Sequence, residues 1–191
     1  MAACARACKR KKASSCYLLG AAYDARGTPE LAERPYHLAC EKNVAVACVA
    51  LAPRVPTTLL LLERACTLGQ AEACTRAASS AGSRDPAQPA ALLRRGCSLG
   101  DPRACLELAN AELASATPAE VEVGGALLLQ ACQRWEPEGC MRLAQLLQSG
   151  SVSARGPLTT LALYDRACAL GEAQGCAELQ RMGLPVGGPL R

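Results

Sequence analysis

The residues in this 191-residue chain best suited to chemistry are its 13 cysteines, because twelve of them share one spacing. Each pair is separated by eight positions: Cys8 with Cys16, Cys40 with Cys48, Cys66 with Cys74, Cys97 with Cys105, Cys132 with Cys140, and Cys168 with Cys176. One continuous helix rises about 12 Å over eight residues, whereas a disulfide needs Cα atoms within about 7 Å. Disulfide bonding within a pair therefore requires the chain to turn back between its two cysteines.

The residues between paired cysteines suit such a turn. In four copies the third residue after the first cysteine is Gly or Asn, the residues that tolerate the left-handed conformation ending a helix; they are Asn43, Gly69, Gly100 and Gly171. Lys11 and Trp135 depart from this preference. A small residue precedes every paired cysteine, which lets two helices approach closely. Each pair is therefore interpreted as a disulfide across a helix–turn–helix corner.

Two other roles for the cysteines are open at this stage. Reduced cysteines would serve as small core residues. Zinc binding is disfavoured, because zinc ligands come from cysteines two to four residues apart that converge with others, so no metal is expected. The thirteenth cysteine, Cys4, stands where the later copies have a large apolar residue. It is expected to be a free thiol that substitutes for that residue.

Internal repetition organises the rest of the chain, since the first cysteines recur every 26 to 36 residues. Predicted helices ending near a first cysteine cover about 1–9, 30–42, 57–67, 87–98, 120–134 and 157–169. Those beginning near a second cysteine cover about 15–25, 45–52, 71–81, 102–114, 137–149 and 172–182. Pro35 is expected to shorten or kink its helix, and Pro53 to compress the third unit. Pro157 suits a first helical turn, and residues 184–191 have the composition of a disordered tail.

Composition limits the class of protein and its compartment. Half of the residues are apolar and the net charge is +4, a balance that does not call for nucleic acid. No apolar run approaches the length of a membrane span. The regular cysteine pairs favour an oxidising compartment, periplasmic or secreted. Met1–Lys12, however, lacks the apolar segment of a signal peptide. Reduced cysteines would instead place the protein in the cytoplasm.

Enzymatic chemistry finds little support among the residues. His37 is the only histidine, so any Ser-His-Asp triad would have to use it, and a solvated or packed side chain is preferred. The serine β-lactamase motifs S-x-x-K, S-D-N and K-T-G are absent, and no phosphate loop follows a strand pattern. No cofactor is therefore expected. Lys9–Lys12 is interpreted as a solvated turn, with contact to an anionic surface as the alternative.

These repeats resemble the Sel-1-like repeats, which are tetratricopeptide-like helical hairpins, and in particular the Helicobacter cysteine-rich proteins. One copy is matched at Tyr164, Ala167, Cys168, Gly171, Gly175, Cys176 and Leu179. A second is matched at Cys132, Gly139, Cys140, Leu143 and Gly150, and a third at Cys16, Leu19, Gly20 and Tyr23. The resemblance implies an all-α, right-handed α-solenoid. We expect about five disulfide-linked units over residues 1–183, the N-terminal one incomplete.

The resemblance also implies a function. Sel-1-like solenoids bind a protein or peptide on a concave face lined by the first helices of their units. Candidate contact residues on that face are Tyr23, Arg76, Glu107, Glu112, Arg142 and Gln145. Trp135, in a turn expected to be exposed, is either a turn-capping residue or an aromatic anchor for a partner. The alternatives are a weak β-lactam hydrolase, as in some cysteine-rich members, and an assembly or redox-linked factor. The oligomeric state is not indicated.

Overall fold

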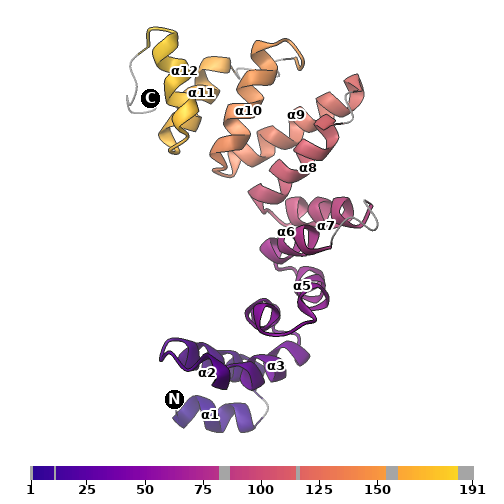
Figure 1. Cartoon of the computed structure of the whole chain (residues 1–191), viewed down its shortest axis with the longest axis vertical. Coiled ribbons are helices and arrows are strands. Elements are labelled where there is room, and N and C mark those ends of the chain that lie inside the picture. Colours follow the sequence, from indigo (N-terminus) through magenta and orange to yellow (C-terminus); the bar gives the residue numbers. More distant parts are fainter. Residues whose placement is uncertain (1, 11, 82–86, 115–116, 154–158, 185–191) are drawn as a thin grey trace. The chain divides into compact units, whose positions relative to one another are not determined.

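The computed structural model describes residues 2–10, 12–81, 87–114, 117–153 and 159–184, and every regular element within these ranges is helical. Two compact units divide the chain, Met1–Leu99 and Gly100–Arg191. In each unit the helices pack on their neighbours along the chain, so that antiparallel hairpins follow one another (Figure 1). The predicted array over residues 1–183 stays a prediction.

The first unit consists of seven α-helices and two short 3-10 helices within its described residues. In chain order they are α1 (Ala2–Lys9), α2 (Ala13–Asp24), η1 (Pro29–Leu31), α3 (Glu33–Glu41), α4 (Ala45–Leu51), η2 (Ala52–Arg54), α5 (Thr58–Thr67), α6 (Ala71–Ser80) and α7 (Ala87–Ser98). The second unit holds α8 (Pro102–Ala114), α9 (Pro118–Gln133), α10 (Pro137–Gln148), α11 (Thr160–Ala169) and α12 (Ala173–Arg181). Helices that begin just before a second cysteine are called A helices below, and those that end just after a first cysteine are called B helices.

The turn from a B helix to the following A helix has one geometry in four hairpins. Asn43, Gly69, Trp135 and Gly171 all have positive φ, between 64° and 94°. In each turn the next residue donates its backbone N–H to a carbonyl five positions earlier, as Glu136 does to Ala131 at 3.1 Å and Glu172 to Ala167 at 2.9 Å. This is the bond that closes a Schellman motif. Trp135 therefore forms the same turn as the glycines, although its residue type does not predict it.

In these four hairpins the turn brings the two cysteines of a pair together. Five disulfides have Cα atoms 4.5 to 4.7 Å apart, and they join Cys8 to Cys16, Cys40 to Cys48, Cys66 to Cys74, Cys132 to Cys140, and Cys168 to Cys176. Cys97 and Cys105 each belong to a disulfide as well. Each of the five pairs joins a B helix to the A helix that follows it. The predicted all-α fold of disulfide-linked helical hairpins is confirmed.

Small side chains fill most of the core, together with large side chains at two recurring positions. Tyr36, Leu62, Leu93, Leu128 and Tyr164, each four positions before a first cysteine, are at most 7% exposed. The leucines or alanine three positions after each second cysteine are equally buried; they are Leu19, Leu51, Ala77, Leu108, Leu143 and Leu179. Cys4 is a free thiol that lies half-buried against the core of the first unit.

The structure differs from the expected elements at few places. The helix expected over 30–42 begins only at Glu33, after the 3-10 turn Pro29–Leu31. Pro35 consequently lies in the first turn of α3, where a missing N–H costs no helical hydrogen bond, so it shortens the helix without kinking it. Pro53 ends α4 after seven residues, as expected. Lys11, Pro157 and residues 185–191 lie outside the described residues.

Candidate partner-binding face

The A helices of the second unit present polar side chains at matching positions. Glu107 and Arg142 stand two residues after the second cysteines of α8 and α10, and Asn110 and Gln145 stand five residues after them. Arg142 donates a hydrogen bond from its guanidinium to the Asn110 side-chain oxygen, which joins the two helices. It also lies 3.9 Å from the carboxylate of Glu138 on its own helix. The predicted residue Arg142 of α10 is thus joined to α8 through Asn110, a residue that was not predicted.

A shallow hollow of about 270 Å³ continues this surface from α10 to the start of α12. Its lining is Glu138, Met141, Arg142, Gln145, Glu172 and Gln174. Met141 is buried, while the predicted residue Gln145 is exposed. Glu172 accepts a hydrogen bond from the backbone N–H of Gln174 at 3.4 Å and thereby caps α12. The hollow offers both hydrogen-bond donors and acceptors around a small apolar floor, a lining suited to a peptide segment.

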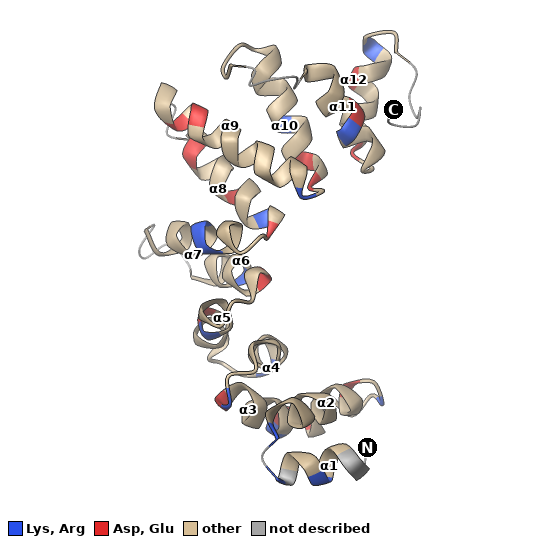
Figure 2. Cartoon of the chain, turned by 180° about the vertical axis from the view of Figure 1, so that it is seen from behind, with Lys and Arg blue, Asp and Glu red and all other residues tan. Residues whose placement is uncertain are grey.

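Two partly buried carboxylates lie beside the same face. Burial raises the pKa of Glu107, and the nearby Arg103 partly opposes that rise. The pKa of Glu136, in the turn before α10, is raised by burial and again opposed by Arg103. Asp101 adds a further negative charge near both groups. Figure 2 shows that acidic and basic residues are interspersed in this unit, so the surface does not carry one sign alone.

The other predicted contact residues lie in varied surroundings. Arg76 forms an ion pair of 3.9 Å with Glu72 on α6. Glu112 is half-buried near the end of α8. Tyr23 lines a groove of about 640 Å³ that α2 shares with α1, η1 and α3, so B helices as well as an A helix surround it. The groove also contains the exposed side chain of Leu31.

Trp135 lies in the turn between α9 and α10 with its side chain 70% exposed. The guanidinium of Arg166 lies over the indole ring, 5.1 Å from its centroid. Arg166 also donates a hydrogen bond to the carbonyl of Gln133 at 3.3 Å. The predicted role of Trp135 as a partner anchor is untested by these contacts.

Arg166 is one member of a recurring contact that the sequence analysis missed. An arginine stands two positions before the first cysteine and reaches the end of the preceding B helix. Arg64 donates to the Glu41 carbonyl and the Asn43 side chain, and Arg95 donates to the carbonyls of Cys66 and Thr67 at 3.1 and 3.0 Å. The sequence signal for this contact is the repeated tripeptide Arg-Ala-Cys or Arg-Gly-Cys. We call these three residues, Arg64, Arg95 and Arg166, the clamp arginines.

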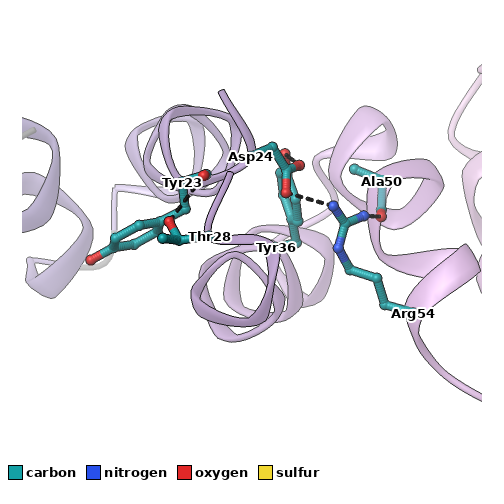
Figure 3. Close-up of polar contacts among 6 residues, drawn as sticks. All are labelled: Tyr23, Asp24, Thr28, Tyr36, Ala50 and Arg54. Carbon is teal, nitrogen blue, oxygen red and sulfur yellow. Dashed lines mark hydrogen bonds and ion pairs between the residues drawn. The ribbon is translucent and has the colours of Figure 1, made fainter. Parts of the chain in front are cut away.

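A second missed feature is a polar network inside the first unit (Figure 3). Tyr36 donates from its hydroxyl to Asp24 at 2.6 Å, and Arg54 pairs with the other oxygen of the same carboxylate at 2.6 Å. Arg54 also donates to the carbonyl of Ala50 and lies over the Tyr36 ring. Burial, followed by the hydrogen bond to Asp24, raises the pKa of the Tyr36 hydroxyl well above its ordinary value. This network links α2, α3 and η2 and is a structural feature.

Two of the cysteines predicted as site residues, Cys48 and Cys74, lie in the core and not at a surface site. Both are fully buried, at 0% exposure, on α4 and α6. Their disulfide partners are also buried, since Cys40 is 3% exposed and Cys66 is 0% exposed. Thiol–disulfide exchange requires an attacking thiolate to reach one of the two sulfurs. Cys48 and Cys74 are therefore structural links between helices, and their burial gives no support to the redox-linked alternative.

The structure gives little basis for other chemistry among its described residues. His37, the only histidine, is exposed and lies 3.4 Å from Glu41 on the next turn of α3. No group of three or more histidine, cysteine, aspartate or glutamate side chains within the described ranges is arranged to hold a metal ion. No helix in the same ranges is long and apolar enough to cross a membrane.

Successive disulfide-linked hairpins with polar A-helix faces define a helical repeat protein. Its fold is that of Sel1-repeat proteins, because the Sel1 repeat protein of Oxalobacter formigenes superposes with a TM-score of 0.72 over 91% of this chain and 78% of that one, at 15% identity. A protective antigen of uropathogenic Escherichia coli, c5321, which displays the same class of fold, gives 0.50 over 96% of this chain at 14% identity. The chain spans about half (52%) of that antigen. Searches with family models and with curated proteins matched nothing.

Proposed function

We propose that this protein is a non-catalytic repeat scaffold that binds a protein or peptide partner on the face formed by its A helices. The observation that carries the proposal is the hydrogen bond from Arg142 to Asn110, which joins the polar side chains of α10 to those of α8. The adjoining hollow extends the surface toward α12. An extended peptide lying across successive A helices can hydrogen-bond to this polar surface and to the lining of the hollow. The backbone of such a peptide carries donors and acceptors along its whole length.

We further propose that Glu107, Arg142 and Gln145 contact the partner directly, with Arg76 as the equivalent residue of the first unit. Arg142 is hydrogen-bonded to Asn110 and paired with the carboxylate of Glu138, and these contacts hold its guanidinium in place. Such preorganisation lowers the entropy cost of binding. Tyr23 and Glu112 are proposed as peripheral contacts. The likeness of the chain to the cysteine-rich Helicobacter branch stays a prediction.

The protein is proposed to work in an oxidising compartment, periplasmic or secreted. What supports this is the number of disulfides, since such bonds persist where thiols are not continuously reduced. A disulfide in every described corner would also keep the spacing of the hairpins fixed while a partner binds.

Site-specific photo-cross-linking tests the binding face. A photoreactive residue is placed at Arg76 of α6 or Gln145 of α10, and in control proteins at the exposed Ala91 of α7 or Ala119 of α9. We expect one and the same partner to be captured from both A-helix positions, in cells that express the protein at its natural level. Equal capture from the B-helix positions would contradict the proposed face.

A further inference from the structure

One disulfide differs from the others in how far the protein covers it. Ten of the twelve disulfide-bonded cysteines are at most 7% exposed. The other two, Cys168 and Cys176, are only half-buried. They nevertheless share the corner geometry of the buried pairs, with Cα atoms 4.6 Å apart and the left-handed Gly171 in the turn between them. Among the described residues, this disulfide is therefore the one that solvent reaches best.

The helix that carries Cys176 is held by few buried contacts of its own. Gly175 and Leu179 are the buried residues of α12, whereas α10 buries five. Within the described residues α12 packs mainly against α11, the helix that carries Cys168. A helix with so small a buried surface depends more on its cross-link than a helix in a filled core does.

The same corner forms one part of the hollow on the A-helix face. Glu172 and Gln174 line that hollow together with residues of α10. Both lie inside the loop that the disulfide between Cys168 and Cys176 closes. Glu172 accepts a hydrogen bond from the backbone N–H of Gln174 at 3.4 Å, so the start of α12 positions both residues. The hollow is thus complete only while α12 keeps its place.

We propose that the disulfide between Cys168 and Cys176 undergoes exchange with a small-molecule thiol, and that this exchange loosens the hollow at the start of α12. The bond is intact at rest in the oxidising compartment proposed above, and it opens where such a thiol is supplied. The second part of the inference rests on the proposed function, because the hollow matters as part of the partner-binding face. The first part goes beyond that function, since it assigns a reversible covalent reaction to one corner.

The exchange follows ordinary thiol chemistry. The thiolate of the small molecule attacks Sγ of Cys168, the bond to Cys176 breaks, and Cys176 leaves as a thiolate. That leaving group lies at the start of α12, where the helix dipole favours a negative charge. A second thiolate attacks the small-molecule sulfur of the mixed disulfide and releases Cys168. Two small-molecule thiols are thereby oxidised to one disulfide, and the cysteine pair is reduced.

Timed alkylation tests the exchange in the folded protein. Cys4 is first blocked with iodoacetamide, 2-mercaptoethanol is added, and new thiols are trapped with N-ethylmaleimide and located by peptide mapping. The matched pair is Cys132 and Cys140, which have the same spacing in the same unit but are 2% and 0% exposed. We expect Cys168 and Cys176 to be labelled about tenfold faster, because attack requires access to sulfur.

Unfolding the protein in guanidinium provides the control for this comparison. The two pairs should then react at rates within about twofold of each other, because burial no longer separates them. Equal rates in the folded protein would overturn the inference, and so would faster labelling of any other pair. A rate difference that persisted in guanidinium would also overturn it, since exposure in the fold would not be the cause.

The effect on the hollow is measured by photo-cross-linking from Gln145, which lines it, and from Arg76 of the first unit, which does not. Treatment with 2-mercaptoethanol should lower capture from Gln145 relative to capture from Arg76. Cys168→Ala/Cys176→Ala should show the lower capture without the thiol and no further response to it. Cys132→Ala/Cys140→Ala should still respond. A response to the thiol that persists in Cys168→Ala/Cys176→Ala would overturn the link to the hollow.

The two experiments separate this inference from the proposed function. If no partner is captured from Gln145 or Arg76, the proposed function fails, and the labelling rates of the folded protein still decide whether exchange occurs at Cys168 and Cys176. If capture succeeds but the labelling rates are equal, the exchange fails and the proposed function stands.

Discussion

At the scale of single residues, the ring of Tyr36 packs directly against Gly20. A Cβ atom added to Gly20 would lie 2.6 Å from Cε1 of that ring. The ring cannot move away easily, since its hydroxyl is bonded to Asp24 and Arg54 lies over its face. The absence of a side chain at residue 20 is therefore a condition for the contact between α2 and α3.

We expect Gly20→Ala to lower the free energy of unfolding by about 1–3 kcal/mol, the usual cost of overpacking a core. Gly27→Ala is the comparison, because its left-handed conformation adds strain but no atom lies within 4 Å of the new Cβ. The double variant Gly20→Ala/Tyr36→Leu reproduces the pairing of Ala52 with Leu62 and should recover part of the loss. Guanidinium unfolding of the wild type, Gly20→Ala, Tyr36→Leu and the double variant measures the coupling. Purely additive effects would contradict the proposed steric origin.

Glu107 provides a prediction that depends on pH. Burial raises its pKa in the folded protein, so the folded state binds this proton more tightly than the unfolded state does. That contribution to stability is complete below the ordinary pKa of about 4.5 and is lost as the pH rises through the folded value. Glu107→Gln should therefore raise the unfolding midpoint at pH 7 and have little effect at pH 4. Unfolding curves at both values test this, and a gain of equal size at pH 4 would contradict it.

At the scale of helices, the clamp arginines connect one hairpin to the next. Each reaches the C-terminal end of the preceding B helix, where carbonyl groups lack helical partners and the helix dipole is negative. Arg95 makes two such bonds, to Cys66 and Thr67. The contact does not involve a disulfide, so it supports the spacing of B helices independently of the redox state.

Replacing Arg95 by glutamine should lower the free energy of unfolding of the first unit by about 1 kcal/mol, since charged hydrogen bonds at a partly exposed helix end are lost. Arg95→Lys should recover part of that loss because it keeps the charge but not the paired geometry. Arg26→Gln is the matched control, as Arg26 is exposed in the turn after α2. Calorimetric or denaturant unfolding measures the difference. If Arg26→Gln lowered the free energy of unfolding as much, the effect would come from the change in net charge and not from the lost hydrogen bonds.

At the scale of the whole molecule, disulfides recur at the corners of the hairpins. The chain-entropy model gives each nine-residue loop roughly 2–3 kcal/mol of stabilisation. In repeat proteins such terms act mainly on neighbouring hairpins. Stability should therefore be distributed along the chain and be lost locally when one disulfide is removed.

Alkylation of the unfolded chain followed by intact-mass measurement tests the redox state. Protein isolated with its native redox state preserved should show one accessible thiol, that of Cys4, before reduction and 13 after it. Peptide mapping then checks the pairing. Thirteen thiols before reduction would show that the cysteines are core residues and would assign the protein to a reducing compartment.

Replacing Cys168 and Cys176 together by alanine should accelerate amide hydrogen exchange in α11 and α12, with little change in α8. Mass spectrometry of peptides after exchange measures this. The equivalent change at Cys132 and Cys140 is the comparison, because that pair has neighbouring hairpins on both sides. Equal acceleration through the whole second unit in both variants would contradict the local effect.

The sequence alone was sufficient for the helices, most of the turns and the class of fold. The spacing of eight, the recurring Gly or Asn and the recurring large core residues all act within one hairpin. Their structural consequences follow from local geometry. The expected and observed helices differ mainly near Pro35. The effect of Pro35 depends on where α3 begins, and the 3-10 turn before Glu33 sets that position.

Contacts between hairpins were decided only by the tertiary structure. The clamp arginines, the network of Tyr36 with Asp24 and Arg54, and the bond from Arg142 to Asn110 join residues 12 to 33 positions apart. No fixed local spacing specifies such partners, since loop lengths differ between copies. The left-handed conformation of Trp135 was also decided by the tertiary structure, because a tryptophan does not itself favour such a turn. Packing of adjacent hairpins positions its ring under Arg166 and leaves it exposed.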